Sequence, residues 1–191
     1  MSLLHRRFTR LSISLLSATI LALGATLPAF ADNGVSLSVT AGTRTASVAN
    51  LPMSAIQYSH SNQAQTGTMT LAADDSTGSG EGWNVTIQSS NFAYSGDSTN
   101  ATAIPAANFS ITTTHAPTMT AGLAVDATNG PKVPASGATG TLDSAHKVLQ
   151  ANAAYGLGTY LQALDVSLAV PAQSRAGAYS ATLTVSITAA P

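Results

Sequence analysis

The chain has 191 residues, of which 45% are hydrophobic, only 8% are charged and none is cysteine. Seven basic residues stand against eight acidic ones, for a net charge of −1, so the composition excludes the basic surface of a nucleic-acid-binding protein. Low charge also argues against a disordered chain, and without cysteine a folded domain must rest on its core and its hydrogen bonds.

The first 31 residues have the pattern of a secretory signal peptide. Basic residues between His5 and Arg10 precede the apolar run 11–27, and Ala29-Phe30-Ala31 is a small-x-small cleavage box. We expect cleavage after Ala31 rather than an uncleaved membrane anchor, because the box lies directly before polar sequence. The predicted mature chain, residues 32–191, has four basic and eight acidic residues, hence a net charge of −4. It is long enough for a single domain, and we expect no membrane contact after cleavage.

Alternation of apolar and polar residues predicts a series of short strands along the mature chain. The predicted strands or short extended elements cover residues 35–40, 45–51, 56–59, 65–73, 83–88, 107–113, 119–125, 147–151, 163–170 and 177–191. Polar or glycine-rich segments such as 74–81, 91–103, 155–158 and 171–177 read as the connections. Without a convincing helix, the pattern indicates an all-β fold: an antiparallel β-sandwich of the Ig-like or Greek-key type, with about seven to ten strands.

The last predicted strand shows the strictest alternation. Tyr179, Ala181, Leu183, Val185 and Ile187 fall on one face, and serine and threonine residues fall on the other. A strand that closes the chain must pair with an earlier strand if it is to complete the fold. We predict that its partner is the segment 82–88, which carries the only tryptophan of the chain, Trp83.

Together these two segments resemble the WxL-domain family of bacterial cell-surface proteins. The family carries one W-x-L signature in mid-domain and a second near the C-terminus. Here the first reads Trp83-Asn84-Val85, and the second lies between Tyr179 and Pro191, with Leu183, Val185 and Ile187 at its apolar positions. Valine replaces leucine at Val85 and tryptophan at Val185, and Ile187 replaces the second leucine.

The resemblance implies a secreted, non-catalytic domain of the bacterial cell surface that binds peptidoglycan non-covalently, alone or with other surface proteins. No sortase-type L-P-x-T-G sequence is present, which agrees with non-covalent attachment. The alternative function is a structural subunit of a surface filament or adhesin complex, assembled by strand exchange. Its motivation is the alternation at the two ends of the mature chain, residues 35–40 and 179–188.

The aromatic residues have alternative roles. Trp83 either fills the core or offers a flat surface to a sugar ring. Tyr155 and Tyr160, in a glycine-flanked stretch, are candidates for exposed aromatic side chains, and packing in a turn is the alternative. Tyr179 is expected to pack its ring and to bond its hydroxyl to the backbone.

The sequence contains no clear motif for metal binding or catalysis. Asp74, Asp75 and Glu81 lie in one loop but lack the spacing of a calcium-binding loop, so a solvated loop is the default. The histidines lack the spacing of zinc ligands, and no G-x-S-x-G turn or clear carboxylate pair is present. We therefore expect no metal, no cofactor and no enzymatic activity.

Overall fold

The computed structural model describes residues 36–190. The chain divides into two units, residues 1–38 and residues 39–191, and the second contains all the secondary structure that is described. The predicted signal peptide lies outside the described residues. No helix among the described residues is long and apolar enough to cross a membrane.

The described part is all-β, as the sequence predicts. The strands are Arg44–Val48 (β1), Gln63–Asp75 (β2), Trp83–Ser89 (β3), Ala93–Ser95 (β4), Phe109–Thr114 (β5), Thr118–Gly122 (β6), Gly140–Thr141 (β7), His146–Ala151 (β8), Gly158–Val170 (β9), Ala178–Ser180 (β10) and Leu183–Ala189 (β11). A single turn of 3-10 helix, Ala106–Asn108, precedes β5.

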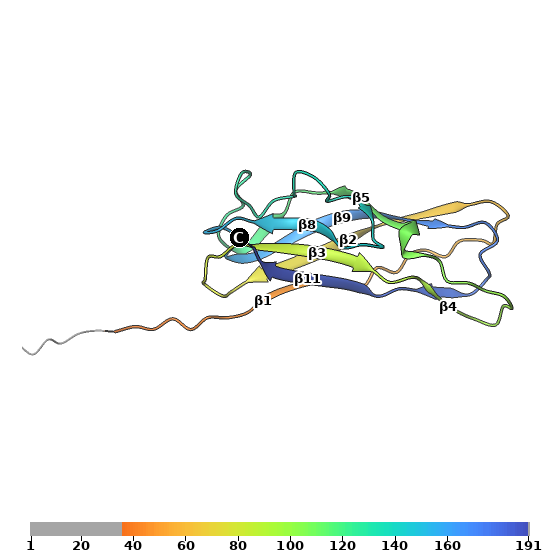
Figure 1. Cartoon of the computed structure of the whole chain (residues 1–191), viewed down its shortest axis with the longest axis horizontal. Helices are drawn as coiled ribbons and strands as arrows, with labels where there is room; N and C mark the ends of the chain where they lie inside the picture. The colour runs from red at the N-terminus through yellow and green to blue at the C-terminus, as the bar shows by residue number, and fades with distance from the viewer. Residues whose placement is uncertain (1–35, 191) are drawn as a thin grey trace, which may run out of the picture. The chain divides into compact units, whose positions relative to one another are not determined.

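Two antiparallel sheets form the layers (Figure 1). The larger has the order β1-β2-β9-β5-β7, and β6 also pairs with β9; the smaller has the order β11-β3-β8. Strands β2 and β9 pair over their whole length, from Gln63 opposite Val170 to Asp75 opposite Gly158. A short two-stranded ribbon, β4 with β10, makes a third sheet. This arrangement agrees with the predicted sandwich, while its assignment to the Ig-like type stays a prediction.

The core lies between the two larger sheets. Alternate residues of β2 and β9 point inward, among them Met69, Leu71 and Leu164, and meet Trp83 and Leu149 of the smaller sheet in one apolar cluster. The opposite face of β2 carries exposed threonines. Period-two alternation in the sequence thus corresponds to one buried and one solvated face.

The predicted pairing of the last strand with the tryptophan segment is confirmed. Strand β11 lies antiparallel to β3, with Val185 opposite Ile87 and Ile187 opposite Val85. Strand β11 is shorter than the predicted strand 177–191 because residues 181–182 are not in a strand and separate β10 from β11. There Thr182 bonds through its backbone to Ser90, and the preceding residues pair with β4 instead.

Two predicted strands are wrong. Residues 36–40 have no secondary structure, and Leu37 and Val39 are 90% and 89% exposed. Alternation alone does not make a strand, because a strand also needs a neighbour for its backbone groups. Residues 56–59 are likewise irregular. Strand β4 was not predicted, because it lies inside the segment 91–103, which the sequence indicates to be a loop.

Candidate functional site

Trp83, the only tryptophan, is a core residue. Its side chain has no exposed surface, and its indole Nε1 donates a hydrogen bond of 2.9 Å to the backbone carbonyl of Gly156. Its ring centroid lies 6.2 Å from that of Tyr160. A side chain with no exposed surface offers no face to a sugar ring, so the glycan-platform interpretation of Trp83 does not fit this structure.

The interpretation of Tyr160 as an exposed aromatic side chain is wrong, and so is the alternative of packing in a turn. Tyr160 lies in β9 and faces the core, and its hydroxyl donates a 2.7 Å hydrogen bond to the carbonyl of Leu123. Burial, with a smaller contribution from the Asp75 carboxylate, raises the pKa of its hydroxyl. The flanking glycines misled the sequence interpretation, because Gly158 begins a long strand rather than continuing a turn. Tyr155 is half-buried.

The residues of the two signatures lie side by side in the smaller sheet. Leu183, Val185 and Ile187 are half-buried on β11, and Val85 is fully buried on the neighbouring strand β3. The replacement of the second tryptophan therefore falls at a half-buried position opposite Ile87. These residues support the packing of the sheet and expose little apolar surface to a ligand.

Tyr179, in the β4–β10 ribbon, lies beside a groove. Its hydroxyl donates a 3.0 Å hydrogen bond to the carbonyl of Arg175, as the sequence predicts for a backbone partner. Its ring packs edge-on against Tyr94, with centroids 5.2 Å apart. No pattern in the sequence pointed to Tyr94, whose hydroxyl donates a hydrogen bond of 2.9 Å to the carbonyl of Ala176. The two tyrosines fix the segment 174–179 on one side of the groove.

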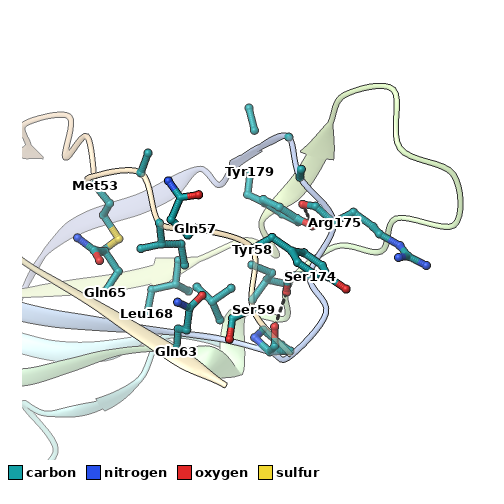
Figure 2. A pocket seen from close by; sticks show the side chains of 18 of the residues that line it. Met53, Gln57, Tyr58, Ser59, Gln63, Gln65, Leu168, Ser174, Arg175 and Tyr179 are labelled. Carbon is teal, nitrogen blue, oxygen red and sulfur yellow. Dashed lines mark hydrogen bonds between the residues drawn. The ribbon is translucent and has the colours of Figure 1, made fainter. Parts of the chain in front are cut away.

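The groove, called here the glutamine groove, has a volume of about 490 Å³. The irregular segment 53–59, the start of β2 and the segment 174–179 surround it (Figure 2). Its polar lining includes the amides of Gln57, Gln63 and Gln65, and Tyr58, which is 50% exposed, supplies an aromatic ring. Gln63 and Gln65 reach the groove because β2 extends past the end of β1.

The chemistry of the glutamine groove is that of a site for neutral, hydroxyl- and amide-rich ligands. A glutamine amide offers both a donor and an acceptor, which matches hydroxyl and acetamido groups. A half-exposed tyrosine adds an apolar face with a polar end. Arg175 is the single charged residue in the lining, so attraction to an anionic ligand is limited.

The acidic loop is held by an arginine. Arg44 donates hydrogen bonds of 3.0 and 3.1 Å to the Asp75 carboxylate, and Glu81 lies 4.0 Å from the same guanidinium. Burial by itself raises the pKa of Asp75, but hydrogen bonds from Thr77 and Arg44 outweigh it and hold the pKa below its usual value. Between residues 36 and 190, no group of three or more His, Cys, Asp or Glu residues is arranged to hold a metal ion.

One cluster contains the residue types of a nucleophilic triad but has a different arrangement. On the outer face of the larger sheet, the Asp165 carboxylate accepts a hydrogen bond from Thr68 at 2.7 Å and lies 2.8 Å from Nε2 of His115. In a triad the hydroxyl contacts the imidazole, which removes its proton. Here the hydroxyl contacts the carboxylate instead, so the imidazole is not placed to activate it.

The described part of the chain is a disulfide-free antiparallel β-domain with a groove lined by neutral polar side chains and a half-exposed aromatic ring. The family model described as "WxL domain surface cell wall-binding" matches residues 29–191. The chain belongs to the WxL family, and its domain is a surface domain of the cell-wall-binding kind. No curated protein and no solved structure matches the chain.

Proposed function

We propose that the protein is exported, that its signal peptide is cleaved after Ala31, and that the single domain of residues 32–191 attaches non-covalently to the cell wall. The proposed ligand is peptidoglycan, and the proposed role is attachment without catalysis. The family match supports attachment at the cell wall. The proposal places the protein outside the cell, in association with the wall.

The lining of the glutamine groove is the observation that supports peptidoglycan as the ligand. Three glutamine amides and the half-exposed ring of Tyr58 surround a groove with one charged residue. A glycan strand with amide substituents presents hydroxyl, acetamido and apolar ring surfaces, which these side chains complement. The net charge of −4 predicted for the mature chain disfavours binding that depends on anionic wall polymers.

The test is co-sedimentation of the exported protein with purified peptidoglycan sacculi. We expect Tyr58→Ala and Gln65→Ala to weaken binding five- to thirtyfold, which corresponds to about 1–2 kcal/mol for a lost aromatic or hydrogen-bonding contact. Tyr155→Ala is the matched control, because Tyr155 is a half-buried tyrosine outside the groove lining. Circular dichroism checks that each variant is folded. Equal binding by all four proteins would contradict the glutamine groove as the binding site. No binding by the wild type would contradict peptidoglycan as the ligand.

A second candidate function, a subunit of a surface filament or adhesin complex, is favoured by a different observation. Residues 36–40 keep strand-like alternation while their apolar side chains are exposed. The C-terminal strand gives no such support, because β11 is already paired with β3 along its length.

A further inference from the structure

Strand β2 has an edge that β1 covers only in part. The pairing of β1 with β2 runs from Arg44 opposite Asp75 to Val48 opposite Leu71, and a last hydrogen bond joins the Ala49 N–H to the Thr70 carbonyl. Alternate residues of a strand direct their backbone groups to the same edge. The N–H and C=O groups of Thr68, Thr66 and Ala64 therefore point to the side on which β1 is missing.

These backbone groups have no partner on that side within residues 36–190. The segment 49–59 passes nearby without pairing: Leu51 lies over the inner face of Gly67, where an added Cβ would approach it to 3.2 Å. An open strand edge with unpaired backbone groups is a template for an added strand.

An apolar groove lies beside this edge, between the two sheets. It has a volume of about 740 Å³, and its lining includes Leu51, Met53, Met69, Phe109 and Leu183. Several of these side chains are partly buried and pack against the main core. A strand added along β2 would direct every second side chain into this groove, so an apolar-polar alternation is the pattern that fits.

The chain carries that pattern in residues 36–40. Leu37 and Val39 alternate with Ser36, Ser38 and Thr40, and both apolar side chains are almost fully exposed. The segment contains no charge and no proline, so it can enter a ladder. Exposed aliphatic side chains in an otherwise polar stretch gain stability by burial, at about 25 cal/mol per Å² of apolar surface.

The segment cannot occupy the edge of its own chain. Backbone hydrogen bonds of 3.0 Å join Gly42 and Thr43 to Ser76. Ser76 directly follows Asp75, the last residue of β2, and so lies at the opposite end of that strand from Gln63. Met69 is seven residues from Ser76, which corresponds to about 23 Å along a strand. Val39 is four residues from Thr43 and reaches at most about 14 Å. If residues 36–40 fill this edge, they must therefore come from another molecule.

We propose that residues 36–40 of one copy add as a strand to the open edge of β2 in a second copy, with Leu37 and Val39 in the apolar groove. Each copy donates one segment and accepts one. The contact joins two different surfaces, so repetition builds a chain of copies or a ring. This self-association does not require the wall ligand, and it gives a physical route to a surface assembly. Met53, Leu168 and Tyr179 line both the apolar groove and the glutamine groove, so the two sites adjoin.

The test is disulfide trapping in the exported protein, whose described residues contain no cysteine. Ser38 and Thr66 both lie on the polar faces of their segments, so Ser38→Cys combined with Thr66→Cys places the two thiols on the same side of the new pair. Thr68→Cys in place of Thr66→Cys allows for the neighbouring register. We expect a ladder of multimers on a non-reducing gel for at least one of these pairs. The control is Ser38→Cys with Ser167→Cys, because Ser167 lies in β9, which is paired on both sides.

Sedimentation velocity supplies a second measurement without cysteines. We expect concentration-dependent multimers of the wild type and their loss in the double variant Leu37→Asp and Val39→Asp, which alters only exposed side chains. Ser36→Asp with Ser38→Asp adds the same charge on the polar face and should retain the multimers. A wild type that stays monomeric at high concentration, an intramolecular disulfide in place of the ladder, or multimers that survive the Leu37 and Val39 changes would each overturn the proposal.

Discussion

The indole N–H of Trp83 donates a 2.9 Å hydrogen bond to the carbonyl of Gly156, a residue 73 positions further along the chain. The bond joins the first residue of β3 to the loop that leads into β9, and so connects the two layers of the fold. The signature tryptophan thus has a structural role in this chain: it fills the core and fixes a loop.

Truncation of Trp83 should cost stability before it affects any ligand. For Trp83→Ala we expect a loss of about 3–5 kcal/mol in the free energy of unfolding, because a large side chain is removed from the core. Trp83→Phe should cost less, although it leaves the Gly156 carbonyl without its donor. Urea denaturation followed by circular dichroism measures both. If Trp83→Ala kept full stability but lost wall binding, the residue would be a contact and not a core residue.

Gly156 should be intolerant of a side chain for the same reason. Its φ is +78°, and an added Cβ would lie 2.5 Å from the Ala151 Cβ and 2.7 Å from the Trp83 Nε1. Gly137 is a matched control, since its φ is +74° but no atom lies within 4 Å of an added Cβ. We expect Gly137→Ala to cost about 1 kcal/mol for the left-handed backbone alone, and Gly156→Ala to cost about 2–3 kcal/mol more. Equal losses in thermal or urea unfolding would contradict the close packing at Gly156.

The Arg44–Asp75 pair predicts how stability depends on pH. The folded-state pKa of Asp75 is lowered from 3.8, so its stabilising contribution is present above about pH 3.8 and is lost as the pH falls through the folded-state value. Arg44→Met should cost about 3 kcal/mol at neutral pH, because the carboxylate is 1% exposed and loses its cation. It should also shift acid unfolding to higher pH. Arg175→Met is the control, since Arg175 is exposed and no ion pair with it is seen in residues 36–190.

Wall binding should respond weakly to salt if the glutamine groove is the site. The Debye length falls from about 8 Å at 0.15 M to about 3 Å at 1 M, which screens exposed charges but leaves neutral hydrogen bonds intact. We expect the amount of protein bound to sacculi to change by less than about threefold over this range. Arg175→Gln should weaken binding less than Tyr58→Ala does. A steep fall with salt would indicate an anionic wall polymer and binding through Arg175.

The amino-acid sequence by itself determined the all-β class, the pairing of the last strand with the tryptophan segment, and the family. The all-β class and the strand pairing depend on period-two alternation, which records which face of a strand is buried. The family rests instead on the resemblance of the two signature segments, Trp83-Asn84-Val85 and residues 179–191. Residues 83–88 and 183–189 alternate strictly, and each lies against an apolar core, so the pattern and the structure agree.

Only the tertiary structure decided the partners of each segment. Residues 36–40 alternate as clearly as β11 does, yet they have no strand beside them, because a strand exists only where another backbone accepts its hydrogen bonds. Tyr160 reads as a turn residue beside two glycines, but β9 directs it into the core. The glutamine groove also depends on the tertiary fold. Arg175 lies 110 positions after Gln65 in the chain, yet both line one groove together with Gln57. They meet where β2 extends past the end of β1, a difference in strand length that local sequence does not encode.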